Sequence, residues 1–352
     1  MQYHVFRVYN TIMRYCIWNN KGGVGKTFLA YCLSVEYAIK NPNKTVVVVD
    51  MCPQANVSEM LLGGNGKGEI NLANCYDNSR TIASYIKSRY DKSRFGKIGD
   101  EVNYFVKVKD YNDAMPHNLY LLPGDVDLDI CSSIIDYLAS APEKGAWMKS
   151  RCFLLDLAEA FELGKKESSV FFIDSNPSFA NYTQLGLVAA DRLIVPCTAD
   201  SASIRGIYNI LRLIYGIRVG HNISEENVFD TFNEKIHDAG VNPPKIHSFV
   251  LNKARTSNKD ASAAYRSHVN EIEKLIAGFS RDYADKFTVA DEENRIFNMK
   301  DCNTLAPVLN YTGLPPSGLH QKQYEIYGQT AQVNKSQIDP FMENLNKITS
   351  AI

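Results

Sequence analysis

The sequence lacks the features of a secreted, membrane-spanning or metal-cluster protein. None of its eight cysteines is spaced as a C-x-x-C pair, and several lie in apolar runs, where cysteine behaves as a small hydrophobic residue. This usage argues against a disulfide framework or an iron–sulfur centre and favours a reducing compartment. No apolar run approaches the roughly 18 residues of a membrane span, and the first fourteen residues lack the apolar core of a signal peptide. We therefore expect a cytoplasmic protein.

An excess of charge of either sign is also missing. The 352 residues include 38 Lys and Arg against 39 Asp and Glu, which gives a formal net charge of −1. Without a global basic field, any contact with nucleic acid must come from a local patch. A hydrophobic content of 45% is enough for a full core, and no internal repeat or low-complexity tract interrupts the chain.

The most informative stretch is Lys21-Gly22-Gly23-Val24-Gly25-Lys26-Thr27. Apolar residues before it predict the end of a buried strand, and the residues after it predict a helix to about Lys40. Glycines between a strand and a helix let successive N–H groups point at one anion. In such a loop Lys26 neutralises the β- and γ-phosphates, and the Thr27 hydroxyl binds Mg²⁺. The pattern therefore predicts a nucleotide site.

Two further strands end in an acid. Thr45–Asp50 and Ser169–Asp174 are apolar runs without polar alternation, which is typical of central parallel strands buried on both faces. Ligands bind beyond the carboxyl ends of such strands. We therefore expect an α/β protein with a mostly parallel sheet flanked by helices, and we expect Asp50 and Asp174 to face the nucleotide.

The spelling of the loop, with a lysine at its first position, resembles the deviant Walker A motif of the ParA/MinD family of ATPases, and within that family the ParA-type partition ATPases. Other segments match in order: Asp50 with Pro53, Gln54 and Asn56, then the Walker B-like strand that ends at Asp174. Gly206 and the Pro307-Val308 pair follow further on. The resemblance implies a three-layer P-loop NTPase fold with a twisted sheet, in a single domain over residues 1–352.

The resemblance also implies ATP and Mg²⁺ as cofactors and assigns roles to residues. Lys21, Lys26 and Asp50 are the catalytic candidates, and Thr27, Asp50 and Asp174 are the metal candidates. Lys21 is expected to reach the ATP of a partner subunit in a homodimer; a solvated loop lysine is the alternative. Asn252 is the candidate for reading the adenine edge, although a loop asparagine without a ligand fits as well. The residues expected to hold ATP are Lys21, Gly22, Gly23, Val24, Gly25, Lys26, Thr27, Phe28 and Asn252.

Two regions depart from the family pattern. Cys52 stands where the family has a second aspartate that orients the attacking water, and a thiol can accept a proton only if it ionises. The chain between Asn56 and the next matching segment is longer than usual, which predicts an insertion around residues 64–116. Residues 80–98 of that region combine basic and aromatic side chains. They form either a nucleic-acid contact or, as we favour, a solvated helix face with its aromatic residues in the core.

Several functions follow from these observations. The first is an ATP-dependent dimerising switch that partitions DNA or positions cargo, binds DNA without sequence specificity, and is reset by a partner protein that stimulates hydrolysis. Lys253, Arg255, Lys259 and Arg266 are the DNA candidates. The second is a nucleotide-gated interaction module with little or no ATPase activity, because of Cys52. A membrane-bound relative and an iron–sulfur reductase fit less well.

The last part of the chain is read from periodicity alone. We expect a strand over residues 286–290 and helices over residues 318–331 and 338–350. Phe341, Met342, Leu345 and Ile348 fall on one face of the final helix. That helix carries only one lysine, Lys347, so packing against the domain is favoured over binding to a membrane.

Overall fold

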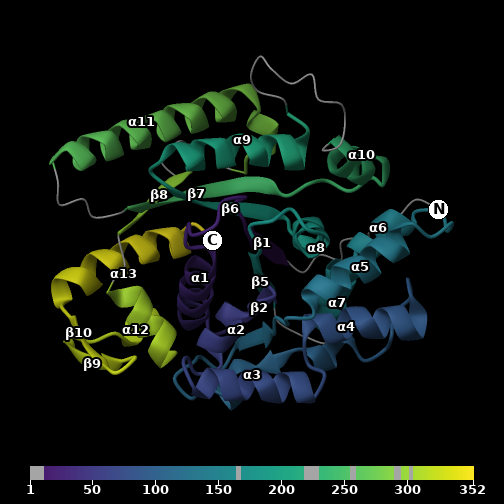
Figure 1. The fold of residues 1–352 in the computed structure, drawn as a ribbon, viewed down its shortest axis with the longest axis horizontal. Coiled ribbons are helices and arrows are strands. Elements are labelled where there is room, and N and C mark those ends of the chain that lie inside the picture. The colour runs from purple at the N-terminus through teal and green to yellow at the C-terminus, as the bar shows by residue number, and fades with distance from the viewer. Residues whose placement is uncertain (1–11, 164–167, 218–229, 254–258, 289–294, 301–303) are drawn as a thin grey trace.

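A twisted sheet of eight strands forms the centre of the molecule in a computed structural model (Figure 1). The structure describes residues 12–163, 168–217, 230–253, 259–288, 295–300 and 304–352. The strand order is β3-β4-β2-β5-β1-β6-β7-β8. Every neighbouring pair is parallel except β3 with β4. The strands are β1 (Met13–Ile17), β2 (Thr45–Met51), β3 (Val106–Lys107), β4 (Leu119–Leu122), β5 (Ser169–Ser175), β6 (Arg192–Thr198), β7 (Lys245–Lys253) and β8 (Ile296–Lys300).

Both faces of the sheet are buried, as the unbroken apolar strands predict. Along β2, Val47 and Val49 contribute to the core on one face, whereas Val46 and Val48 contribute to the core on the other. This alternation follows from the two-residue period of a strand. A strand with helices on both sides therefore needs apolar residues at every position.

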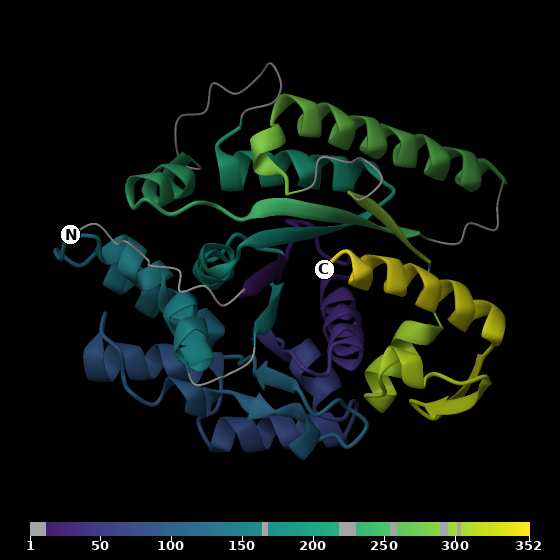
Figure 2. The same cartoon turned by 180° about the vertical axis from the view of Figure 1, so that it is seen from behind.

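Helices cover the two faces, which gives three layers. One face carries α1 (Lys26–Lys40), α2 (Asn56–Leu61), α12 (Leu305–Thr312) and α13 (Lys335–Ser350). The other carries α4 (Ile82–Ser88), α5 (Leu128–Ala139), α7 (Phe153–Leu163), α8 (Asn181–Ala189), α9 (Ser201–Tyr215), α10 (Asp230–Asp238) and α11 (Lys259–Asp282). Seen from behind, α12 and α13 lie to one side of α1, and α4 to α7 lie to the other (Figure 2). The expected three-layer P-loop NTPase fold is confirmed.

The segment 64–116 folds into short elements at the β3 edge of the sheet. It contains α3 (Lys67–Asp77), α4, a single π-helical turn (Arg89–Ser93) and β3. Tyr85 is buried, as expected for an aromatic residue of a helix face. Arg89, however, is not solvated. It is 1% exposed, donates to the Tyr85 hydroxyl at 2.7 Å, and forms a 3.0 Å ion pair with Asp156.

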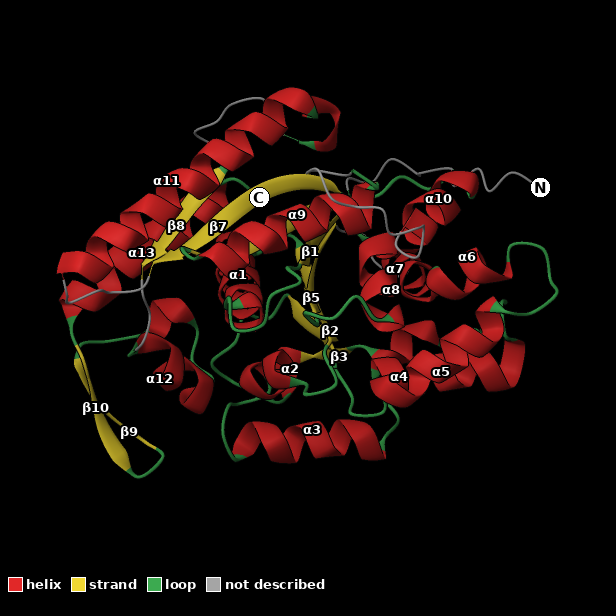
Figure 3. Cartoon of the chain, turned by 45° about the horizontal axis from the view of Figure 1, so that its top comes forward, coloured by secondary structure: helices red, strands yellow, loops and turns green. Residues whose placement is uncertain are grey.

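The helix expected over residues 318–331 is wrong. The structure has a hairpin there, formed by β9 (Lys322–Ile326) and β10 (Gln329–Val333), which stands apart from the main sheet (Figure 3). Tyr324, Ile326 and Val333 are buried whereas their neighbours are exposed, which is the two-residue period of a strand. Tyr327 and Gly328 form the turn, both with positive φ.

Two other expectations about the C-terminal part have different outcomes. Residues 284–286 form a 3₁₀ turn, and Phe287 makes only an isolated bridge to Ile246, so the strand expected at 286–290 is wrong over its described part. Strand β8 is not among the elements predicted from the sequence. The final helix packs as expected, because Phe341, Leu345 and Ile348 are buried in the core that α1 shares. No helix in the described ranges is long and apolar enough to cross a membrane.

Candidate functional site

The phosphate loop joins β1 to α1 at the carboxyl edge of the sheet. Gly23 and Gly25 have φ values of +73° and +85°, which other residues rarely adopt. The turn ends at Gly25, so that α1 begins at Lys26 and directs its free N–H groups into the loop. A Cβ on Gly25 would lie 3.0 Å from the side-chain nitrogen of Asn252. The end of β7 therefore lies directly against the loop.

Lys26 is folded back onto the loop that precedes it. Its Nζ donates to the carbonyl oxygens of Asn19 at 3.1 Å and of Lys21 at 2.6 Å. Burial lowers the pKa of Lys26 to about 8, against the opposing effect of Asp174. An incoming phosphate would restore the preference for the charged form, because a nearby anion raises the pKa of an amine.

Asp50 and Asp174 lie side by side at the ends of β2 and β5, where they are partners in the strand register. Asp50 is well satisfied: its Oδ1 accepts from the Cys52 amide at 3.0 Å, and its Oδ2 accepts from the amide and hydroxyl of Ser58 at 3.1 and 2.7 Å. Asp174 is also fully buried, yet neither of its carboxylate oxygens accepts a hydrogen bond of good geometry from the residues that the structure describes. Burial, followed by the charge of Asp50, raises the pKa of Asp174.

This arrangement fits a hard divalent cation. The ligand atoms of Asp50, Cys52 and Asp174 all lie within 4.8 Å of one another, and the Thr27 hydroxyl is close enough to lower the pKa of Asp174. A buried carboxylate without a donor is costly, and a cation would remove that cost. Mg²⁺ takes oxygen ligands, so the two aspartates and Thr27 fit it, whereas the Cys52 thiol does not.

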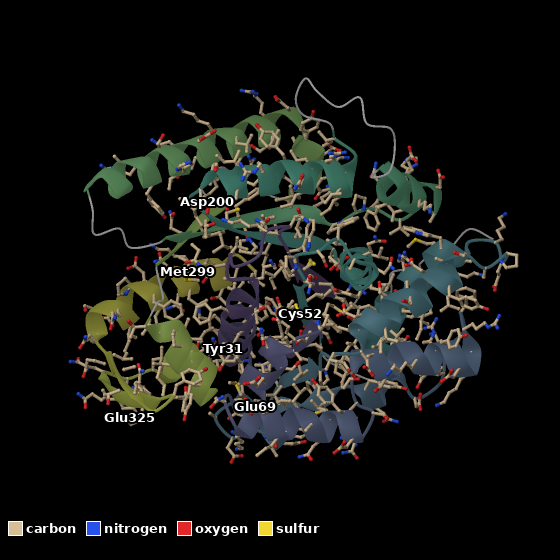
Figure 4. The ribbon with its side chains drawn as sticks, in the orientation of Figure 1. Tyr31, Cys52, Glu69, Asp200, Met299 and Glu325 are labelled. Atoms are coloured by element: carbon tan, nitrogen blue, oxygen red, sulfur yellow. The ribbon has the colours of Figure 1, made fainter. Side chains whose placement is uncertain are left out.

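Cys52 lies beside Asp50 and Asp174, near the middle of the molecule in the view of Figure 4. Burial raises the pKa of its thiol, and the carboxylates of Asp174 and Asp50 raise it further. The thiol therefore stays protonated at neutral pH. It cannot act as a general base there, because only the thiolate accepts a proton.

Lys21 makes its contacts within its own chain. Its Nζ lies 2.5 Å from both Thr198 Oγ1 and Asp200 Oδ2 and 3.4 Å from Ser203 Oγ. Asp200, labelled in Figure 4, is the N-cap of α9, where its side chain accepts from the Ser203 amide. Burial alone would raise the pKa of Asp200, but hydrogen bonds from Lys21, Thr198 and the Ser203 amide lower it to about 2.

Most of the residues predicted from the sequence come together at this one edge. The loop from Lys21 to Thr27, both aspartates and Asn252 surround the same space. Phe28 differs, because its ring stacks against Phe341 of α13 at a centroid distance of 6.1 Å.

Sequence reasoning missed the residues that hold the site in place. Ser58 orients Asp50, and nothing in the sequence distinguishes it from any other serine. Asp200 does carry a signal in the sequence, because Asp200-x-x-Ser203 before an apolar-periodic run is the pattern of a helix N-cap.

The DNA candidates are only partly described. Arg266 is exposed on α11, whereas Arg255 and the side chains of Lys253 and Lys259 lie outside the described residues. The described exposed side chains of α11 include acids such as Glu271 as well as bases, so as a set they are not uniformly basic.

Comparison with known proteins gives consistent matches. A family model described as "AAA domain" matches residues 13–225. A ParA family protein of Mycoplasma genitalium is 24% identical over 70% of this chain and 78% of its own length. The chromosome-partitioning ATPase Soj of Treponema pallidum is 24% identical over 58% of this chain and 64% of its own.

Solved structures share the fold at low sequence identity. Apo McdA of Cyanothece superposes with a TM-score of 0.56 at 17% identity, covering 96% of this chain and 99% of that one. A putative plasmid partition protein of Borrelia burgdorferi bound to AMPPNP gives a TM-score of 0.53 at 16% identity, covering 97% and 100%.

Proposed function

Because this chain belongs to the AAA domain family matched over residues 13–225 and is a P-loop ATPase of the ParA/MinD type, we propose that it is an ATP-dependent dimerising switch that partitions DNA or positions cargo. One observation carries the proposal. The phosphate loop, with its two lysines, meets a buried carboxylate, Asp174, to which none of the described residues donates a hydrogen bond of good geometry. Such a site suits a triphosphate and its cation.

The residues of the loop would divide the work of binding. Backbone N–H groups from Gly22 to Thr27 would surround the phosphates. Lys26 would exchange the carbonyls of Asn19 and Lys21 for the β- and γ-phosphates. Thr27, Asp50 and Asp174 would hold Mg²⁺, which neutralises phosphate charge when bound. Asn252, beside Gly25, would contact the adenine or the loop itself.

Lys21 is the proposed switch residue. It now pairs with Asp200 in its own chain, and it would leave this pair to reach the ATP of a partner subunit. A half-exposed ion pair is worth about 0.2–1 kcal/mol, so binding of ATP can pay the cost of breaking it. Two cations at the γ-phosphate would then stabilise the charge that develops during transfer.

Sizing and ATP turnover of the full chain test this proposal. With ATP and Mg²⁺ the wild type should shift from monomer to dimer, and Lys21→Ala should abolish turnover. Asp200→Asn keeps a good N-cap residue but removes the charge that retains Lys21, so it should dimerise at lower protein concentration. Absence of an ATP-induced dimer, together with wild-type behaviour of Lys21→Ala, would overturn the proposal.

Non-specific DNA binding and a partner that stimulates hydrolysis are part of the same proposal. DNA retention should require ATP and weaken steeply as salt rises, because released counterions drive such binding. Arg266→Glu should reduce retention. Retention that ignores both ATP and salt would contradict the DNA-binding part alone.

Cys52 favours a second candidate, a nucleotide-gated interaction module that binds ATP with little or no turnover. Its thiol has a raised pKa and replaces the family's water-orienting carboxylate. ATP-dependent dimerisation without turnover, even with DNA and partner present, would favour this reading over the first.

A further inference from the structure

Helix α5 exposes an apolar stripe that the proposed ATP site does not use. Val126, Ile130 and Tyr137 are 62%, 58% and 59% exposed. Val126 lies in the turn just before α5, whereas Ile130 and Tyr137, seven residues apart, lie on one side of the helix. The exposed ring of Tyr90 contacts Tyr137 at a centroid distance of 5.9 Å and widens this surface toward α4. We call Val126, Ile130, Tyr137 and Tyr90 the α5 surface.

Two carboxylates line one edge of this surface. Asp129 and Asp136 are also seven residues apart, and each directly precedes an apolar residue of the stripe. Both are exposed, with the Asp136 side chain at 65%. No Lys or Arg occurs within Leu128–Ala139.

At this edge the carboxylate of Asp136, and not its nearby base, is the exposed group. Arg151 lies 3.6 Å from Asp136 but its side chain is only 3% exposed, so it sits beneath the carboxylate. Lys87 is paired with Asp127, the N-cap residue of α5. Among the described residues, Asp129 accepts a 3.3 Å hydrogen bond from the neutral hydroxyl of Tyr182.

We propose that the α5 surface is a docking site for a cationic amphipathic helix of a partner protein. The surface runs along α5, whose 12 residues Leu128–Ala139 span about 18 Å, which matches a little over three turns of a helix. Apolar residues of the partner lie on Ile130 and Tyr137, and two Lys or Arg two turns apart face Asp129 and Asp136. This is helix recognition by an apolar stripe with a charged edge.

A second copy of this chain fits the surface less well. A two-fold pair that packs α5 on α5 would bring Asp129 and Asp136 close to the same residues of the other copy. Opposed like charges cost several kcal/mol at an interface. The acidic edge therefore selects a cationic partner over self-association.

The docking site is joined to the ATP site by hydrogen bonds. Gly124, just before α5, donates to Ser58 Oγ at 3.0 Å, and that hydroxyl donates to Asp50. A second link comes from α8, the helix that follows the loop after Asp174. Its Asn181 donates to the Ser132 carbonyl of α5 at 3.2 Å. A helix bound to α5 thus contacts an element that is linked by hydrogen bonds to the segments following both Asp50 and Asp174. The docking itself does not depend on ATP hydrolysis.

The test uses two synthetic, fluorescein-labelled helical peptides with the same leucine face, one with two flanking Arg seven residues apart and one with Glu at those positions. The full chain should bind the Arg peptide at least ten-fold more tightly in fluorescence anisotropy. Ile130→Asp should lower that affinity at least ten-fold. Ile70→Asp on α3, at a residue 66% exposed, should leave it unchanged.

Charge reversal makes the test specific. The double variant Asp129→Lys/Asp136→Lys should prefer the Glu peptide. If this charge reversal prevents folding, the neutral double variant Asp129→Asn/Asp136→Asn takes its place, and it should bind both peptides equally. No binding, equal binding of both peptides, or indifference to Ile130→Asp would overturn the proposal. Self-association of the wild type that Ile130→Asp abolishes would also overturn it, since the surface would then be an interface between copies.

Discussion

At the scale of single residues, the contrast between Asp50 and Asp174 is the most informative feature of the site. Three donors satisfy the first carboxylate, whereas no described residue donates to the second in good geometry. Two buried acids that are register partners on neighbouring strands therefore have different roles. Asp50 holds the segment from Cys52 to Ser58 in place by hydrogen bonds, and Asp174 remains available to a cation.

Asp174→Asn should therefore stabilise the ligand-free chain. The pKa of this acid is higher in the folded than in the unfolded state, so stability is lost as pH rises through the folded-state pKa. A neutral amide does not ionise and avoids this loss. We expect a gain of roughly 1 kcal/mol at pH 7. The variant should also lose the Mg²⁺-dependent part of the stabilisation by ATP, measured as a thermal shift. For a ligand at a hundred times its Kd, this stabilisation is about 2.7 kcal/mol.

Asp50→Asn is the matched control for this prediction. It leaves donors on Cys52 and Ser58 without their carboxylate, so it should destabilise the free chain instead. Thermal melts of both variants, with ATP and either Mg²⁺ or EDTA, give the comparison. An Asp174→Asn chain that keeps the full Mg²⁺-dependent shift would show that the cation binds elsewhere.

Cys52→Asp should raise ATP turnover. A carboxylate at this position can accept a proton from water, which the protonated thiol cannot, and positioned bases typically contribute about 10²–10⁴-fold. Cys52→Ser, similar in size but without the charge, should not raise it. Steady-state phosphate release measures both; equal rates in wild type and Cys52→Asp would mean that another residue orients the water.

The residues of the site that sequence could predict are those with a fixed spacing around a ligand. Binding of phosphate and Mg²⁺ requires particular residue types at fixed positions. These positions are the loop from Lys21 to Thr27 and the acids at the ends of two apolar strands. Ser58 and Asp200 act through tertiary contacts, eight and 179 residues from the groups that they hold. Such partners become visible only when the chain is folded.

At the scale of elements, the hairpin of β9 and β10 shows where periodicity was misread. Residues 318–331 contain helix-compatible residues, but burial of Tyr324 and Ile326 follows a two-residue period. The Tyr327-Gly328 turn, with φ values of +50° and +70°, is the local signal. It is easily overlooked because the more familiar first residue of such turns is Asn or Asp.

Gly328→Ala should destabilise this hairpin specifically. A Cβ there meets no atom within 4 Å, so the cost comes from the backbone alone, about 1–2 kcal/mol for a left-handed residue. Limited proteolysis should cleave the hairpin faster in this variant. Gly328→Asn should be milder, because Asn tolerates positive φ, and Gln329→Ala at the exposed neighbour should have no effect. Equal cleavage of Gly328→Ala and wild type would contradict the assigned turn.

At the scale of the whole molecule, His247 connects the far parts of the chain. It lies on β7, and its Nε2 donates to the Ala351 carbonyl just beyond α13 at 3.0 Å. Its Nδ1 accepts from Arg192 of β6 at 3.3 Å. Two neighbouring strands of the sheet, β6 and β7, and the last residues of the chain therefore meet at one neutral imidazole.

This histidine should make the protein sensitive to mild acid. Burial, followed by the charge of Arg192, lowers the pKa of His247 to about 4, below the value of about 6.5 in an unfolded chain. The unfolded state therefore binds more protons between these values, so stability is complete above pH 6.5 and is lost as pH falls toward 4. Between pH 7 and pH 5 the loss amounts to about 2 kcal/mol.

His247→Gln isolates this contribution from those of the buried acids, whose raised pKa values act in the opposite direction. The glutamine can still hydrogen bond but does not titrate in this range. Urea unfolding of both proteins at pH 7 and pH 5 should show that the wild type loses about 2 kcal/mol more than the variant. An equal loss in the two proteins would mean that His247 is already protonated in the folded state, and that the end of α13 is not held by a neutral imidazole.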